Sequence, residues 1–312
     1  MYAIGFNKYG GTDVFEKLQL ARPTYNENQL LVKTIMSGVN PYDGFLRSGA
    51  MKEIRPLDFP AIIGSELVGK VIEIGHNVTR FQVGDIVIAR PSLGGYGEYV
   101  AVSQDLVMKK PESMSLEIAA GFAAVNVTAF WSITGFVPIE KGQTIIIQGA
   151  SGAVGSVAVQ IAKDQGLKVI AIGNSRNHDY VLSLGADEFV PYDQVNIFEK
   201  LANQGDFVFD ASLGGKGAKE GLAMVKDGGY YVSLTDVPEA VSNKQIKIIA
   251  MRLTPEMTTS KAFAYLSDLY QRKGIIMATA LVFPLTVSGV KQAHDAISTK
   301  TVAGKILLKA AE

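Results

Sequence analysis

Three glycines at three-residue spacing give the strongest chemical signal in the sequence. Gly149, Gly152 and Gly155 lie between an apolar run at residues 144–148 and a stretch of small and branched residues at 154–164. This order is typical of a turn between a buried strand and a helix. The free backbone N–H groups at such a helix start, together with the helix dipole, attract a pyrophosphate. The spacing therefore predicts a dinucleotide-binding turn.

The two later glycines have separate roles in this interpretation. Gly152 lets a phosphate approach the backbone because it has no side chain, and Gly155 lets the helix pack tightly on the sheet. We expect Ser151, Gly152, Ala153 and Val154 to bind the cofactor. A P-loop is disfavoured because no Gly-Lys-Ser/Thr sequence follows the glycines. A purely structural turn is the alternative.

The residues after the next apolar run, at 168–172, indicate which coenzyme binds. NAD-binding proteins usually place Asp or Glu there to hold the ribose 2′-hydroxyl, but this sequence continues with Asn174, Ser175 and Arg176. We find no carboxylate there that would repel a 2′-phosphate, and the arginine offers a permanent charge and a fork of donors. The segment therefore predicts NADPH, bound by these three residues. The alternative is that Arg176 is a solvated residue at a helix start.

Length and composition indicate an ordinary globular protein. The chain has 312 residues, of which 47% are apolar and 19% charged. This length suggests about two domains, and the composition excludes a disordered, collagen-like or coiled-coil chain. Lys plus Arg and Asp plus Glu number 30 each, so no overall basic excess favours nucleic acid. No apolar run reaches the about 18 residues of a membrane helix, and no signal peptide is evident. We expect a cytoplasmic protein with no nucleic-acid or membrane partner.

Cysteine and histidine usage argues against a metal site. The chain contains no cysteine, which excludes disulfides, thiolate metal sites and cysteine nucleophiles and suits a reducing compartment. His76, His178 and His294 are far apart and lack the short spacings of a zinc site. We expect no bound metal, and we expect His76 and His294 to be solvated.

The first third of the chain reads as a β-rich domain. Short apolar runs at residues 29–35, 65–74, 85–89 and 96–102 are separated by Gly and Pro. Many short strands with turn signals between them predict a small barrel or sandwich, mostly antiparallel.

The pattern changes near residue 115. Strands are predicted at 144–148, 168–172, 206–210, 229–234 and 304–309, and helices at 115–133, 154–164, 178–184, 217–225, 258–272 and 287–298. Alternating strands and helices predict a parallel sheet with right-handed crossovers. The fold class is therefore α/β, with a Rossmann-type doubly wound sheet beside the β-rich domain.

Further segments, each weak alone, occur in the order and at the spacing of one known family. They are residues 38–49, 59–66, 81–85, 95–100, 126–129, 184–187 and 303–308, together with the glycine turn. With these segments the chain resembles the zinc-independent quinone oxidoreductases of the medium-chain dehydrogenase/reductase superfamily over nearly its whole length.

The resemblance implies a domain organisation and an activity. A GroES-like partial β-barrel at residues 1–118, to which residues 282–312 return, would accompany a Rossmann NADPH-binding domain at 119–281. Cofactor and substrate would meet in the cleft between the domains, and the protein would be a homodimer or higher homo-oligomer. The implied reaction is hydride transfer from NADPH to a quinone or α,β-unsaturated carbonyl. A non-enzymatic NADPH-binding protein is the alternative.

Three positions depart from the zinc-dependent relatives. Asn40 and Ala124 stand where those proteins carry zinc-binding Cys, and Ser65 stands where they carry His. The four-Cys structural zinc lobe has no counterpart. Without a Lewis acid to stabilise an alkoxide, simple alcohol oxidation is disfavoured, whereas a conjugated acceptor needs less help.

The resemblance also implies residues on the acceptor side of the site. Asn40 is expected to bond the nicotinamide ribose or the acceptor carbonyl, and Tyr42 and Phe45 to wall a flat acceptor. Asp43 would hold this loop, or would simply be a turn carboxylate. Many family members carry Tyr at the position of Phe45, so its phenolic hydrogen bond is missing. Glu66 is left open between a buried carboxylate paired with an arginine and a catalytic group.

On the cofactor side, five more residues match family positions. Thr128 corresponds to a threonine that touches the cofactor phosphate, and Lys305 to a basic residue that reaches the pyrophosphate. Tyr192 corresponds to a tyrosine near the 2′-phosphate or adenine, with a core aromatic as the alternative. Leu234 and Thr235 are expected to flank the nicotinamide.

Overall fold

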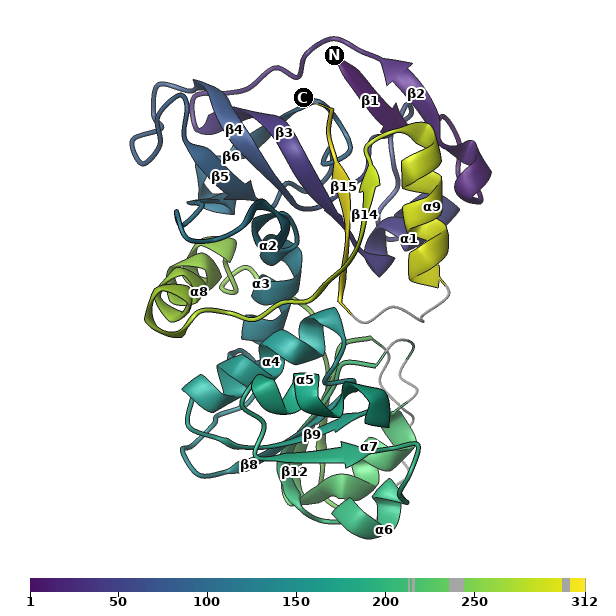
Figure 1. Ribbon diagram of the computed structural model, residues 1–312, viewed down its shortest axis with the longest axis vertical. Coiled ribbons are helices and arrows are strands. Elements are labelled where there is room, and N and C mark those ends of the chain that lie inside the picture. Colours follow the sequence, from purple (N-terminus) through teal and green to yellow (C-terminus); the bar gives the residue numbers. More distant parts are fainter. Residues whose placement is uncertain (213, 215–216, 236–243, 299–303, 312) are drawn as a thin grey trace. The chain divides into compact units, whose positions relative to one another are not determined.

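The backbone of the computed structural model divides into two compact units (Figure 1). One unit contains Met1–Ala124 together with Ala278–Glu312, and the other contains Val125–Met277. The structure describes residues 1–212, 214, 217–235, 244–298 and 304–311. The crossings between the units lie a few residues from the boundaries 118/119 and 281/282 expected from the sequence. The first unit is thus built from both ends of the chain.

The first unit is β-rich, as predicted. Its main sheet has seven strands in the order β14-β15-β3-β4-β5-β7, with β6 paired to β3, and β1 and β2 form a separate pair. All described pairs are antiparallel except β14 with β15. The strands are β1 (Tyr2–Gly5), β2 (Glu16–Gln19), β3 (Gln29–Val39), β4 (Leu67–Ile74), β5 (Ile86–Ala89), β6 (Tyr99–Ser103), β7 (Val107–Lys109), β14 (Thr279–Pro284) and β15 (Lys305–Lys309).

Short helices accompany this sheet. They are η1 (Thr12–Val14), α1 (Pro41–Ser48), η2 (Gln104–Leu106), α2 (Leu116–Ala120) and α9 (Val287–Ser298). The helix predicted at 115–133 is in fact two helices, α2 and α3 (Phe122–Thr134), because Gly121 interrupts it. Ser115 caps α2, as its position suggested, by accepting the N–H of Ile118 at 3.2 Å.

Two apolar clusters hold this unit together. One lies between β3, β4 and β5 and includes Leu30, Val32, Leu67 and Val87, all fully buried. The other joins the N-terminal strand to the C-terminal helix and includes Ile4, Phe6, Phe15, Val290 and Leu308. Burial of such side chains contributes about 1.5–3 kcal/mol each, so residues from the two ends of the chain stabilise one core.

The second unit is a parallel α/β layer structure, which confirms the predicted fold class. Its six strands pair in parallel in the order β10-β9-β8-β11-β12-β13. They are β8 (Thr144–Gln148), β9 (Lys168–Gly173), β10 (Glu188–Pro191), β11 (Gly205–Asp210), β12 (Val225–Ser233) and β13 (Lys247–Ala250). Ile145, Ile146 and Ile147 are all fully buried, as expected for a strand covered on both faces.

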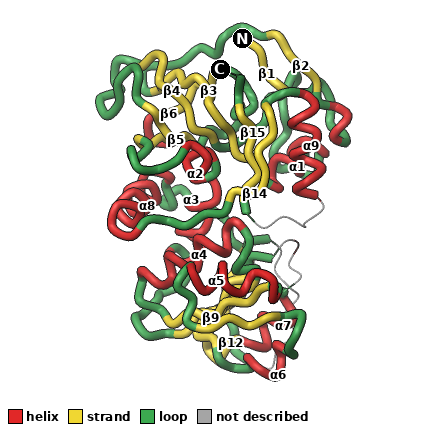
Figure 2. The backbone as a smooth tube through the Cα atoms, viewed as in Figure 1, coloured by secondary structure: helices red, strands yellow, loops and turns green. Residues whose placement is uncertain are grey.

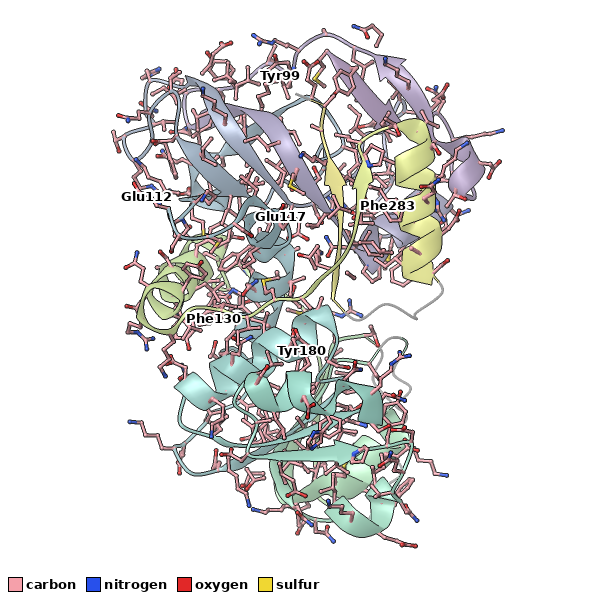
Figure 3. All side chains as sticks on the ribbon, in the orientation of Figure 1. Tyr99, Glu112, Glu117, Phe130, Tyr180 and Phe283 are labelled. Atoms are coloured by element: carbon pink, nitrogen blue, oxygen red, sulfur yellow. The ribbon has the colours of Figure 1, made fainter. Side chains whose placement is uncertain are left out.

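Helices cover both faces of this sheet. Figure 1 shows α4 (Ala153–Asp164) and α5 (His178–Ser183) on one face, and α6 (Ile197–Leu201) and α7 (Ala218–Met224) on the other. The unit also contains η3 (Ser175–Asn177) and α8 (Thr259–Lys273). Phe130 of α3, labelled in Figure 3, packs against Tyr265 of α8 with ring centroids 4.8 Å apart.

Some of the observed strands were not predicted from the sequence. Strands β10, β13 and β14 are short, and each of them forms an edge of its sheet; β14 is labelled in Figure 2. Natural proteins often keep edge strands very short or charged, and so short a run gives only a weak periodic signal. Ala303, the first residue of the family-like segment 303–308, lies outside the described residues. No helix in the described part of the chain is both long and apolar enough to cross a membrane.

Candidate functional site

The glycine turn has the geometry of a phosphate-binding helix start. Gly149 adopts a left-handed conformation with φ of +71°. A Cβ on Gly155 would lie 2.2 Å from the carbonyl oxygen of Gly149, so only glycine fits there. Gly152 is the N-cap of α4, and the N–H groups of Ala153 and Val154 therefore have no acceptor within the helix. These amides are available to an anion.

A hydrogen bond fixes the serine of this turn. The hydroxyl oxygen of Ser151 accepts the side-chain N–H of Asn177 at 3.0 Å. Asn177 belongs to η3, which follows β9, so the bond ties the glycine turn to the segment predicted to read the 2′-phosphate. The structure thus brings these two predicted parts of the cofactor site together.

The segment after β9 differs from the prediction in one respect, the presence of a carboxylate. Asn174 caps η3 by accepting the N–H of Arg176 at 3.3 Å, and Arg176 is exposed. However, Ser175 donates its backbone N–H to Asp193 at 2.8 Å and its hydroxyl to the same carboxylate at 2.6 Å. The expectation that no carboxylate lies here was wrong. Asp193 follows the end of the neighbouring strand, β10, and not that of β9.

The strand register explains this contact. Pro191 at the end of β10 pairs with Gly173 at the end of β9 in parallel, so residues two positions later on each chain segment meet. The hydrogen bonds from Ser175 hold the pKa of the Asp193 carboxyl below its ordinary range.

Tyr192 is 55% exposed, so the alternative that it is a core aromatic was wrong.

Three other predicted cofactor residues lie elsewhere in the same unit. Thr128 is half-buried on α3. Leu234 and Thr235 follow β12, where the N–H of Leu234 donates to the carbonyl of Asp210 at 2.9 Å. The hydroxyl of Thr235 is buried and has no hydrogen-bond partner among the described residues. The contacts predicted between these residues and a cofactor stay predictions.

In the first unit, Asn40 lies at the junction of β3 and α1, between two charged side chains. Its amide nitrogen donates to Glu66 Oε1 at 2.9 Å, and its amide oxygen accepts from Lys305 Nζ at 2.5 Å. Lys305 also forms an ion pair with Glu66 Oε1 at 2.5 Å. The exposed fractions are 9% for Asn40, 0% for Glu66 and 4% for Lys305. We call these three residues the buried triad.

The backbone around the buried triad is shaped to admit it. A Cβ on Gly38 would lie 2.4 Å from Glu66 Oε1, and a Cβ on Gly121 would lie 2.5 Å from Cγ of Lys305. The N–H of Ala124 donates to Glu66 Oε2 at 2.8 Å. Glu66 is therefore a partnered buried carboxylate: Lys305 forms an ion pair with it, and Arg90, the kind of residue expected beside it, also interacts with its charge. The pyrophosphate contact predicted for Lys305 stays a prediction.

A second series of hydrogen bonds ends at Asp43 on α1. Asp43 Oδ2 accepts the N–H of Asn40 at 2.8 Å and the hydroxyl of Tyr96 at 3.2 Å. Tyr96 contacts His294 Nε2 at 3.1 Å, and His294 Nδ1 contacts Arg47 at 3.1 Å. Arginine only donates, so Nδ1 accepts and Nε2 carries the hydrogen that bonds Tyr96. Arg47 therefore donates to His294, His294 to Tyr96, and Tyr96 to Asp43.

His294 corrects a prediction. It is 2% exposed, not solvated, because it lies on the apolar face of α9. Burial, together with repulsion from Arg47, lowers its pKa to about 3. Burial raises the pKa of Asp43 to about 7. His76 is exposed beside Glu27, as predicted.

The two predicted aromatic walls are both partly accessible. Tyr42 is half-buried and its hydroxyl accepts a hydrogen bond from Arg55 at 3.0 Å. Phe45 on α1 is 48% exposed, which is unusual for a large aromatic residue. Contact of either side chain with an acceptor stays a prediction.

Comparison with known proteins decides the family. Residues 26–112 match the family described as "Alcohol dehydrogenase GroES-like domain", and residues 153–265 match "Zinc-binding dehydrogenase". A quinone oxidoreductase of Pongo abelii is 31% identical over 240 residues, which are 74% of this chain and 72% of that protein. The chain belongs to the quinone oxidoreductase family of the medium-chain dehydrogenase/reductase superfamily.

Two further comparisons extend over the full length. A chloroplastic quinone-oxidoreductase homolog of Spinacia oleracea is 28% identical and matches 99% of this chain and 98% of its own. The solved structure of the Escherichia coli quinone oxidoreductase complexed with NADPH superposes with a TM-score of 0.85 at 24% identity, covering 99% of this chain and 100% of that one. The quinone oxidoreductase architecture, a GroES-like part and a Rossmann-type sheet, is confirmed.

The residues present in this quinone oxidoreductase family member do not fit zinc. The chain has no cysteine, and the positions that the resemblance matches to zinc ligands hold Asn40, Ser65 and Ala124. The amide of Asn40 is already held by Glu66 and Lys305, and a buried ammonium repels a second cation. Among the described residues, no three His, Cys, Asp or Glu side chains gather as a metal would require.

Proposed function

We propose that this chain is an NADPH-dependent oxidoreductase that reduces quinones or α,β-unsaturated carbonyls by hydride transfer without a metal. The observation that carries the proposal is the turn at Gly149–Gly155, where one glycine can bear no side chain and the first amides of α4 are unpaired. The names of the relatives support the reaction class. NADPH supplies, when bound, a hydride from C4 of its nicotinamide.

The cofactor-binding residues are proposed on the second unit. The turn residues Ser151, Gly152, Ala153 and Val154 bind the pyrophosphate, and Thr128 contacts a phosphate. Asn174, Ser175, Arg176 and Tyr192 surround the 2′-phosphate, and Leu234 and Thr235 flank the nicotinamide. All of these residues belong to one unit, and the bond between Asn177 and Ser151 fixes two of the contact segments relative to each other.

Asn40 is proposed as the polar contact to the ligand. A side-chain amide has two N–H donors and one carbonyl acceptor. In the buried triad the carbonyl accepts from Lys305 and one N–H donates to Glu66, which fixes the orientation of the amide. The second N–H is free to donate to an acceptor carbonyl or a ribose hydroxyl, and the nearby ammonium strengthens it as a donor.

The first unit is proposed to bind the acceptor through Asn40, Tyr42, Asp43 and Phe45. Asp43 positions Asn40 through the hydrogen bond at the start of α1, and the two aromatic rings offer a flat apolar surface. A conjugated acceptor spreads the developing negative charge onto oxygen, so a single directed hydrogen bond in place of a Lewis acid suffices to orient it. The protein is further proposed to be a cytoplasmic homodimer or higher homo-oligomer, which light scattering after gel filtration tests.

Turnover of the purified protein tests this function. The purified chain is mixed with NADPH and a panel of quinones and enones, and oxidation of NADPH is followed by its absorbance. Activity should persist after extensive chelation, and elemental analysis should find less than stoichiometric zinc. Binding of NADPH without turnover of any acceptor would favour the non-enzymatic alternative, and failure to bind either coenzyme would refute the proposal.

A further inference from the structure

The Ser175–Asp193 contact bears on coenzyme choice. Ser175 offers two donors at the place where the proposed function puts the 2′-phosphate, and both are taken by one carboxylate, at 2.8 Å and 2.6 Å. To donate to a phosphate, each of these groups must first give up its hydrogen bond to the carboxylate, which weakens phosphate binding. The following inference rests on that placement of the 2′-phosphate.

The charge balance at this edge of the sheet differs from what the sequence of β9 alone indicates. Arg176 adds one positive charge, and Asp193 adds one negative charge that acts on the same segment, since Arg176 itself contributes to keeping Asp193 ionised. Both side chains are exposed. A phosphate monoester carries about −1.5 to −2 charge at neutral pH. The carboxylate therefore opposes much of the attraction that the guanidinium provides.

The position of Asp193 is fixed by the sheet. The pairing of Pro191 with Gly173 aligns the ends of β10 and β9, and Ser175 holds the carboxylate through two bonds of good length. Tyr192, the preceding residue, is exposed at the same edge. Asp193 is therefore held beside the 2′-phosphate position.

We propose that Asp193 determines coenzyme specificity in this chain by weakening the preference for NADPH over NADH. Its carboxylate competes with the 2′-phosphate for Ser175 and repels it. A ribose 2′-hydroxyl, by contrast, can donate a hydrogen bond to the same carboxylate. The side chain thus acts against one coenzyme and in favour of the other.

Binding measurements on two variants test this proposal. Dissociation constants for NADPH and NADH are measured by titration for the wild type, Asp193→Asn and Asp193→Ala. Both variants remove the charge, and only Asn keeps an acceptor for Ser175. Both should raise the NADPH-over-NADH affinity ratio about tenfold. This is the change expected when a single negative charge close to a doubly charged phosphate is removed. The gain should shrink between about 50 mM and about 500 mM salt.

The control is Glu199→Gln, which removes one exposed negative charge from α6 of the same unit without touching Ser175. It should leave the affinity ratio unchanged. An equal gain in the control, or a lower NADPH affinity in Asp193→Asn, would overturn the proposal. In the second case Asp193 would be a positioning residue for Ser175. If the wild type binds neither coenzyme, the proposed function fails instead.

Discussion

Lys305 lies opposite Asn40 across the β15–β3 pair, and its ammonium donates to the Asn40 amide oxygen at 2.5 Å although 265 positions separate the two residues. The antiparallel register, in which Ile306 pairs with Val39, brings them together. Glu66 reaches the same amide because β4 lies on the other side of β3. The polar group proposed to contact ligand is thus oriented by both neighbouring strands.

Loss of the Lys305 charge should destabilise the first unit. Lys305→Met leaves the fully buried carboxylate of Glu66 without its cation, which costs about 3–5 kcal/mol in comparable buried pairs. Chemical denaturation measures the free energy of unfolding. Lys309→Met, at the exposed end of the same strand, should change it little. A Lys305→Met loss no larger than that of Lys309→Met would contradict the buried ion pair.

Asn40→Ala should affect turnover more than folding. The ion pair between Lys305 and Glu66 survives the change, but the directed N–H donor is lost. Removal of a hydrogen bond to a developing charge costs about 1.5–3 kcal/mol, so kcat/KM for a quinone should fall about 10- to 100-fold. Steady-state kinetics and a thermal melt test this. An unchanged kcat/KM would exclude Asn40 from the site.

The glycine turn offers a matched pair of substitutions. Gly155→Ala places a methyl group 2.2 Å from the carbonyl oxygen of Gly149, whereas the nearest atom to a methyl group on Gly152 is 3.2 Å away. Gly155→Ala should therefore lower the melting temperature and abolish NADPH binding. Gly152→Ala should have a melting temperature close to that of the wild type. It should nevertheless bind NADPH at least tenfold more weakly, because the methyl group lies where the phosphate approaches the backbone. Equal melting of both variants would show that the helix does not pack as described.

His294 should make folding sensitive to acid. Its pKa is about 3 in the folded chain against an ordinary value of 6.5, so the unfolded state binds more protons between these values. The contribution of neutral His294 is therefore complete above pH 6.5 and is lost as the pH falls toward 3. The difference in unfolding free energy between wild type and His294→Gln should shrink from pH 7 to pH 4. A constant difference would mean that His294 does not titrate in this way.

Asp43 should have the opposite effect. Burial raises its pKa from 3.8 to about 7, so the folded state keeps a proton that the unfolded state has released. This contribution is complete below pH 3.8 and declines as the pH rises toward 7. Asp43→Asn removes it, and the variant should lose stability on acidification more steeply than the wild type. Denaturation midpoints at a series of pH values provide the comparison.

Features formed by residues close together in the sequence could be predicted, whereas contacts between distant segments could not. The glycine turn lies within one strand–turn–helix segment, so its spacing alone identified it. Asp193 was not predicted because it follows a different strand from Ser175, although the rule that adjacent parallel strands end at the same edge could have paired the two residues. His294 was also within reach, since it shares a helical face with Val290 and Ala293, both buried.

The buried triad could not be predicted in the same way. Its members come from the ends of three strands, and nothing near Glu66 or Asn40 in the sequence indicates that Lys305 will be their partner. The glycines that make room for it, Gly38 and Gly121, have ordinary negative-φ backbones, so only the packed structure shows why a side chain is excluded there. The resemblance to a family supplied the positions but not these contacts.

The use of β15 in the first unit has a consequence for biosynthesis. On the ribosome, Glu66 and Asn40 emerge long before Lys305, so the nascent N-terminal segment lacks the cation that neutralises its interior. The intervening parallel sheet draws all of its described strands from residues between Glu66 and Lys305. The sheet of the first unit therefore receives β15, the partner of β3 on one side, only after the whole second unit has been translated.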